Sequence, residues 1–199
     1  SGILNAQNQS PVVKEVLPGY IMGAQAKLPK VIMETGSKDV LWSEDFGSGI
    51  PAGWATGSAG DFCNWNYTTQ GPQGPFSVGV PPIASTSADN GFIILDPDLC
   101  NISTPYQVVD AFIQTEKLNL EDYPNVRLEF QHNFRYCCDP VNSKLQVLVS
   151  NDSINWVAFD VKNGLGPNNT SANPLFQAVN ISEVAGGQSS VWIRFHQSG

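Results

Sequence analysis

Short stretches in which apolar and polar residues alternate, separated by clusters of Gly, Pro, Asn and Ser, make up most of this chain. The longest alternation covers residues 126–136. Its even-numbered positions carry aliphatic and aromatic side chains together with His132, and its odd-numbered positions carry Arg, Glu, Gln and Asn. Because successive side chains of a strand point to opposite faces, this period of two predicts a long strand with one face on a core.

Similar but shorter patterns predict further strands at residues 40–46, 62–67, 91–95, 108–115 and 190–196, and a hairpin formed by 145–150 and 156–161. Residues 69–90 contain four prolines and are expected to form a long ordered loop. Nothing longer than two turns has the 3.6-residue period and caps of a helix. The pattern therefore predicts an all-β fold, a two-sheet antiparallel β-sandwich of the jelly-roll kind.

The first part of the chain is different. Residues 1–38 mix polar residues with scattered apolar ones and contain Pro11, Pro18 and Pro29, which argues against a long helix. We expect an extended N-terminal arm or linker over 1–38 and a single sandwich over 39–199, a length that suits one all-β domain. The start at Ser1, without a charged and then apolar leader, is typical of a processed terminus.

Charge and hydropathy limit the classes of partner that we expect for this chain. The formal net charge is −8 and the sequence pI is about 4.5, so the chain lacks the basic surface that nucleic acid requires. The sequence contains no apolar run of about 18 residues, so we expect no membrane span. Spare carboxylates in Gly- and Asp-rich loops suit a hard cation such as Ca²⁺.

The four cysteines are Cys63, Cys100, Cys137 and Cys138. They lack the paired short spacings of a zinc site, which favours disulfides. Adjacent cysteines form a strained ring when joined, so we expect one or both of Cys137 and Cys138 to pair with Cys63 or Cys100. Disulfides indicate an oxidising compartment, and buried free thiols in a reduced protein are the alternative.

Several motifs occur in the order of one known family. Residues 41–46 (LWSEDF) followed by 49–54 (GIPAGW), then 88–96 (ADNGFIILD), 128–132 (LEFQH), 145–156 with its V-x-V-S-x-D-x-x-x-W-like hairpin, and 191–196 (VWIRFH) resemble the cleaved-adhesin, MAM-like and choice-of-anchor J group of extracellular domains. The resemblance covers roughly residues 40–199.

The resemblance implies a concanavalin-like jelly roll on a secreted or cell-surface protein, often one exported by type IX secretion, that serves in adhesion or beside a catalytic domain. Domains of this group usually end with a further strand carrying an acidic pair, which this chain does not reach. We therefore expect the sandwich to lack its last strand, so that an adjoining domain or a partner strand completes the sheet.

The resemblance also points to a structural Ca²⁺ at Glu44, with Asp61, Asp89 and Asp96 as further candidate ligands from neighbouring loops. Calcium needs six to eight oxygens, which such loops can gather. The alternative is that these carboxylates are solvated turn residues, and Asp96 followed by Pro97 is also a common way to open a turn.

Aromatic side chains offer a second kind of candidate site. Trp54, Trp65 and Tyr67 lie in or beside Gly-rich loops and could stack against sugar rings or peptide side chains. The alternative is that they fill the core or its ends. His132 falls on the apolar face of its strand and is expected to be a hydrogen-bonded core residue rather than a zinc ligand.

The sequence contains no Gly-x-Ser-x-Gly elbow, His-Glu-x-x-His helix, phosphate loop or closely spaced Glu-x-Asp-x-x-Glu strand. We therefore predict a protein that is not an enzyme: a calcium-stabilised adhesion or binding module for a surface glycan or protein ligand. A structural segment completed by partner chains is the alternative. A sandwich-fold glycanase is less favoured, although its two carboxylates could come from distant strands.

Overall fold

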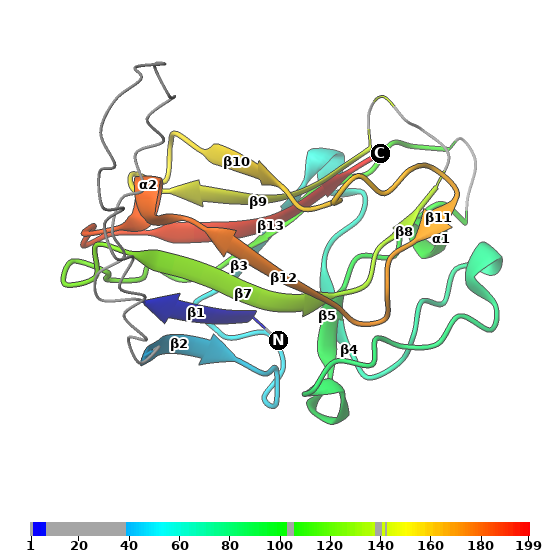
Figure 1. Ribbon diagram of the computed structural model, residues 1–199. Helices are drawn as coiled ribbons and strands as arrows, with labels where there is room; N and C mark the ends of the chain where they lie inside the picture. Colours follow the sequence, from blue (N-terminus) through cyan, green and yellow to red (C-terminus); the bar gives the residue numbers. More distant parts are fainter. Residues whose placement is uncertain (1, 7–38, 103–105, 138–140, 142) are drawn as a thin grey trace, which may run out of the picture.

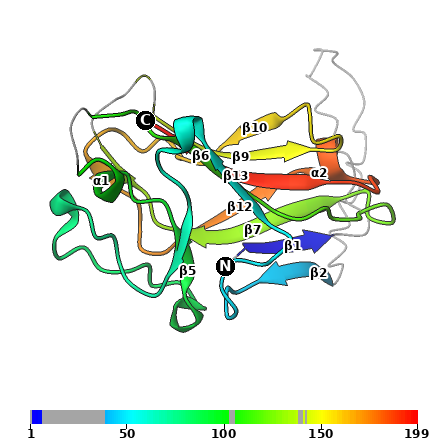
Figure 2. The same cartoon turned by 180° about the vertical axis from the view of Figure 1, so that it is seen from behind.

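The computed structural model describes residues 2–6, 39–102, 106–137, 141 and 143–199. Two antiparallel sheets stack over one another across one side of the view, and shorter elements gather at the other end (Figure 1). The opposite view shows the same two layers from behind (Figure 2). The all-β sandwich predicted from the sequence is confirmed.

The first sheet has four strands in the order β12-β7-β1-β2. Their bounds are β12 Leu175–Asn180, β7 Val126–His132, β1 Gly2–Ala6 and β2 Asp39–Glu44. All three pairings are antiparallel, and β12 pairs with β7 over six residues.

The second sheet has five strands in the order β10-β9-β13-β6-β3. Their bounds are β10 Val157–Asp160, β9 Lys144–Ser150, β13 Trp192–Ser198, β6 Asp110–Gln114 and β3 Ala55–Ser58. The hairpin expected from the pattern is the β9–β10 pair. The strand β13, although last in the sequence, lies in the middle of this sheet, between β9 and β6.

The core lies between the two sheets. Leu128 of β7, Val147 and Val149 of β9 and Ile193 of β13 are all fully buried. They form one apolar cluster with Val179 of β12. The sequence pattern predicted strands with one face on a core, and the structure has them. Every second side chain of these strands points toward the facing sheet.

The rest of the fold, at the other end of the sandwich, is made of short pieces. Two two-stranded sheets are present: β4 Asn66–Thr68 with β5 Phe92–Ile94, and β8 Arg135–Tyr136 with β11 Asn169–Thr170. Single turns of helix are η1 Ala59–Asp61, η2 Pro75–Ser77, η3 Ala88–Asn90 and α1 Pro97–Cys100, while α2 Ser182–Ala185 lies at the opposite side of Figure 1. Residues 59–102 are called the loop end below.

The structure differs from the expected elements in several places. The strand expected at 62–67 is β4 at Asn66–Thr68, and β11 was not expected. Gly2–Ala6, assigned to an extended arm, is a strand between β2 and β7, and residues 7–38 of that arm lie outside the described residues. The strand expected at 126–136 is divided into β7 and β8. Strands β3 and β12 were not expected, because their sequences, ATGS and LFQAVN, have only a weak apolar alternation. They form because β3 pairs with β6 and β12 pairs with β7.

Within the part of the chain that the structure describes, none of the helices has the length and apolar character needed to cross a bilayer.

Candidate binding site

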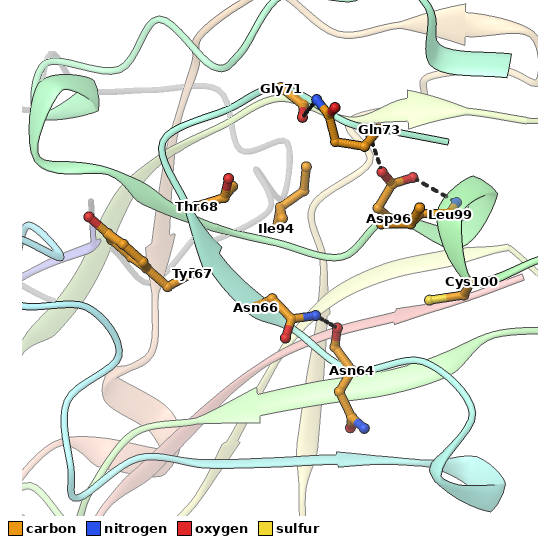
Figure 3. A pocket seen from close by; sticks show the side chains of 10 residues that line it. All are labelled: Asn64, Asn66, Tyr67, Thr68, Gly71, Gln73, Ile94, Asp96, Leu99 and Cys100. Atoms are coloured by element: carbon orange, nitrogen blue, oxygen red, sulfur yellow. Dashed lines mark hydrogen bonds between the residues drawn. The ribbon is translucent and has the colours of Figure 1, made fainter. Parts of the chain in front are cut away.

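A pocket of about 230 Å³ opens at the loop end, between the β4–β5 pair and α1 (Figure 3). Three amide side chains contribute to its lining: Asn64, Asn66 and Gln73. The other lining residues are two hydroxyl-bearing ones, two apolar ones, one carboxylate, one half-cystine and one glycine: Tyr67, Thr68, Ile94, Leu99, Asp96, Cys100 and Gly71. Nearly all of these residues are uncharged, and the surface that they expose to the pocket is mostly apolar with a smaller polar share.

Asp96 shapes this pocket by binding backbone groups. Its Oδ1 accepts a hydrogen bond from Leu99 N (3.2 Å), which caps the start of α1. Its Oδ2 accepts from Gln73 N (2.6 Å) and Gly74 N (3.2 Å). One carboxylate thus ties the loop before η2 to the start of α1 and fixes two walls of the pocket relative to each other (Figure 3).

Two amide groups in the lining retain unused acceptors. Asn66 Nδ2 donates to Asn64 O at 2.7 Å, and Gln73 Nε2 donates to Gly71 O at 2.8 Å. Among the described residues, no hydrogen bond involves Asn66 Oδ1 or Gln73 Oε1. Each amide is therefore held in place through its nitrogen and keeps an oxygen that can accept a hydrogen bond from a ligand hydroxyl or amide.

A disulfide lies at the end of α1, beside the pocket. Cys63 and Cys100 are joined, with their Cα atoms 5.7 Å apart. The expectation that Cys137 or Cys138 would pair with Cys63 or Cys100 is therefore wrong. The sequence could not reveal the pairing because it depends on α1 packing next to the residues after η1, where Phe62, Trp65 and Cys100 surround a small buried cluster. Cys137 is disulfide-bonded as well, and Cys138 lies outside the described residues.

Trp54 lies away from this pocket, in an aromatic cluster. Its ring stacks on Trp42 at a centroid distance of 5.8 Å and meets Phe46 edge-on at 5.7 Å. Its Nε1 is buried and has no hydrogen-bond partner among the described residues. These contacts correspond to the packing alternative considered for this tryptophan.

Trp65 precedes β4 and Tyr67 is its middle residue, and both make contacts within the fold. Trp65 is half-buried against the small cluster around Cys63, and its Nε1 donates to Ala111 O of β6 at 3.3 Å. Tyr67 is 40% exposed, lines the pocket, and donates from its hydroxyl to Asn90 O at 2.9 Å. Of the three aromatic candidates, Tyr67 is the one that lies in the pocket lining.

Two of the candidate calcium ligands lie in neighbouring segments. Asp45, next to Glu44, accepts from Asn90 Nδ2 at 2.8 Å, and Asn90 follows Asp89 in η3. Glu44 Oε1 also accepts from Phe46 N. The Asp45–Asn90 hydrogen bond thus places the segment after β2 next to η3, which contains Asp89.

The other two candidates are placed elsewhere. Asp61 ends η1 with a positive φ of 53° and an exposed side chain, and Asp96 has its oxygens committed to three backbone N–H groups. No hydrogen bond within the described residues joins either of them to Glu44 or Asp89. Across those same residues, no group of three or more His, Cys, Asp or Glu side chains is arranged to hold a metal, so Ca²⁺ stays a prediction that depends on carbonyl and amide oxygens as well.

Sequence reasoning missed the amide residues of the pocket. Asn64 and Gln73 belong to no motif, and Asn66 only begins an Asn-x-Thr triplet. The three meet because β4 pairs with β5 and the chain then returns past α1. The one available signal was the long proline-containing loop at 69–90, a type of segment that often carries function.

Comparisons with known proteins give one similar structure. The K1 cleaved adhesin domain of Lys-gingipain from Porphyromonas gingivalis W83 is 19% identical and aligns over 78% of this chain and 88% of that chain, with a TM-score of 0.44. A likeness of this degree assigns neither a family nor a ligand. No protein-family model and no curated protein matches the chain.

Proposed function

We propose that this chain is a non-catalytic binding module of an exported surface protein, and that it binds an uncharged carbohydrate in the pocket at the loop end. The observation that carries the proposal is the pair of anchored amides, Asn66 and Gln73, each fixed through its nitrogen with its oxygen unused. Sugar hydroxyls are donors and acceptors that match such groups, and the apolar side chains Ile94 and Leu99 can contact the faces of a sugar ring.

The same lining favours binding over hydrolysis. Glycosidases use two carboxylates, one as acid and one as base or nucleophile. Asp96 is the single carboxylate that lines this pocket, and both of its oxygens accept backbone hydrogen bonds. A protein built to bind a surface glycan needs no such pair.

The Cys63–Cys100 disulfide supports the exported setting. Disulfides persist in oxidising compartments, and this one fixes α1 beside the pocket. Secretion through the type IX route is a further part of the proposal and rests on the sequence resemblance alone.

Calcium is proposed as a structural ion at the edge formed by Glu44 and Asp89. It would stabilise the segment after β2 against η3, which Asp45 and Asn90 already join. Adding Ca²⁺ to chelator-treated protein should raise the melting temperature. Glu44→Gln together with Asp89→Asn should abolish that increase, whereas Asp61→Asn serves as the control and should retain it.

The binding proposal is tested with a glycan array followed by calorimetric titration of the neutral oligosaccharides that bind. We expect Gln73→Ala and Asn66→Ala each to weaken binding about tenfold, the size of one or two lost hydrogen bonds. Gln70→Ala, a neighbouring amide outside the lining, should leave binding unchanged. An array without a bound glycan, with or without Ca²⁺, contradicts the proposal.

A second candidate function is assembly with a partner protein through the apolar surface beside the pocket. Phe76 is 83% exposed and Val78 is 89% exposed, and they lie in and just after η2, which contacts α1. Large exposed apolar side chains in one place are typical of an interaction surface. Light scattering during size-exclusion chromatography discriminates, because a monomer that retains glycan binding disfavours obligate assembly.

A further inference from the structure

Arg194 occupies the outer face of the five-stranded sheet, away from the pocket. Its neighbour Ile193 is fully buried, and so are Ile113 of β6 and Val149 of β9, which pair with Phe195 and Ile193 of β13. Successive side chains alternate between faces, so Arg194 and the residues opposite it, Gln114 and Leu148, point outward.

Three contacts hold this guanidinium in one place. It stacks on the Phe112 ring at 3.9 Å and on the Trp156 ring at 3.8 Å from centroid to Cζ. Its Nε donates to Gln114 Oε1 at 2.8 Å. Two rings and one amide restrain the plane of the side chain, so little conformational entropy remains to be lost when a ligand binds it.

The Arg194 guanidinium has no carboxylate partner among the described residues. Within that same part of the chain, no hydrogen bond involves its Nη1 or Nη2. Contact with the two rings removes part of its hydration, and this burial lowers the pKa of the guanidinium from its ordinary value. A positioned guanidinium with both terminal nitrogens free is the geometry that a carboxylate accepts in bidentate fashion.

We propose that the outer face of the five-stranded sheet binds a saccharide that carries a carboxylate, with the carboxylate on the Nη atoms of Arg194. Gln114 and Gln146, which face the same way, offer amides for the neighbouring hydroxyl groups. The site is separate from the pocket and does not depend on the function proposed for that pocket.

Two observations favour an acidic sugar over an acidic peptide. Arg194 lies in β13, whose backbone is fully paired with β9 and β6, so a peptide cannot add as a strand there. The net charge of −8 opposes ligands with many negative charges. A single carboxylate on a polyhydroxylated ligand fits both conditions.

The test uses three probes on the intact chain: a tetrasaccharide containing one glucuronate, its carboxyl-reduced neutral counterpart, and the peptide Gly-Asp-Gly. In ¹H–¹⁵N spectra the glucuronate probe should shift the Arg194 Nε–H and Trp156 indole signals, and the neutral counterpart should bind at least about tenfold more weakly. Because these signals belong to the unaltered protein, this measurement does not depend on whether a variant folds.

Variants complete the test. Arg194→Lys keeps the charge but loses the planar fork, and it should weaken glucuronate binding about tenfold or more. Lys144→Gln, which removes one positive charge from the same face, should change binding less than about twofold. Equal binding of the neutral sugar, equal losses in the two variants, or tighter binding of Gly-Asp-Gly would each overturn the proposal.

Discussion

The sandwich and the loop end of this molecule are held together in different ways. In the sandwich, β7, β9 and β13 pair over four to seven residues with their neighbours and place side chains such as Leu128 and Val149 in one core. In the loop end, the β4–β5 pair is three residues long, and order depends on Asp96 and the Cys63–Cys100 disulfide. The first region is stabilised by many similar contacts, and the second by a few specific ones.

This difference shows why the pocket is where it is. The long strands of the sandwich pack apolar side chains into a continuous core, whereas short segments joined by single side chains leave amides such as Asn66 and Gln73 beside a cavity. Sites on connections held by a rigid scaffold are common for this reason. Changes in the sandwich should therefore affect the whole fold, while changes in the loop end should act first on the pocket.

The largest effect is expected from the core of the sandwich. Leu128→Ala removes a fully buried side chain from the middle of β7 and should lower the free energy of unfolding by about 4 kcal/mol. Chemical denaturation monitored by circular dichroism measures it. Val78→Ala, at an exposed position of the loop end, is the control and should cost less than about 0.5 kcal/mol.

The second largest effect is expected from the loss of the Cys63–Cys100 disulfide. Replacing both Cys63 and Cys100 by Ser opens a loop with a sequence separation of 37 and should lower the free energy of unfolding by about 3 kcal/mol. Hydrogen exchange should accelerate first at α1 and the β4–β5 pair, before β9 and β13. Uniform acceleration across both regions would contradict the distinction drawn between them.

His132 lies where β7 leaves the core toward the loop end. Burial lowers the pKa of His132 from 6.5 to about 4, and its Nε2 has no partner among the described residues, contrary to the hydrogen-bonded histidine expected. The unfolded chain binds this proton more readily, so stability should fall as the pH decreases from about 6.5 to 4, by up to about 3 kcal/mol. Chemical denaturation at several pH values measures this decrease in the free energy of unfolding. His132→Phe should remove the part of the decrease that is due to His132.

The smallest effect is expected at Asp96. Asp96→Ala removes the cap of α1 and the acceptor of Gln73 N and Gly74 N, which should cost about 1–2 kcal/mol. The pocket should lose ligand affinity by more than this change in stability suggests, because its two walls are no longer joined. Asp61→Ala is a suitable control, since Asp61 is exposed and lies outside the pocket lining. Unchanged ligand binding in Asp96→Ala would show that the loops are held in another way.

The sequence by itself determined three interior strands of the sandwich, but not β1, β3 or β12. Alternation at residues 126–132, 145–150 and 192–196 is read directly in the strands β7, β9 and β13, because burial on one face requires a period of two wherever the strand lies. The same reasoning found no segment longer than two turns with the period and caps of a helix, and α1 and α2 have four residues each.

Only the tertiary structure decided which side chains contact one another. Cys63 meets Cys100, Asp96 binds Gln73 and Gly74, and Arg194 lies between Phe112 and Trp156. Each of these contacts joins segments far apart in the sequence. A residue's own neighbours in the chain fix which face it prefers, but strand order and loop paths fix what it meets there. For that reason the pattern of apolar residues determined the layers, and the folded chain determined the sites.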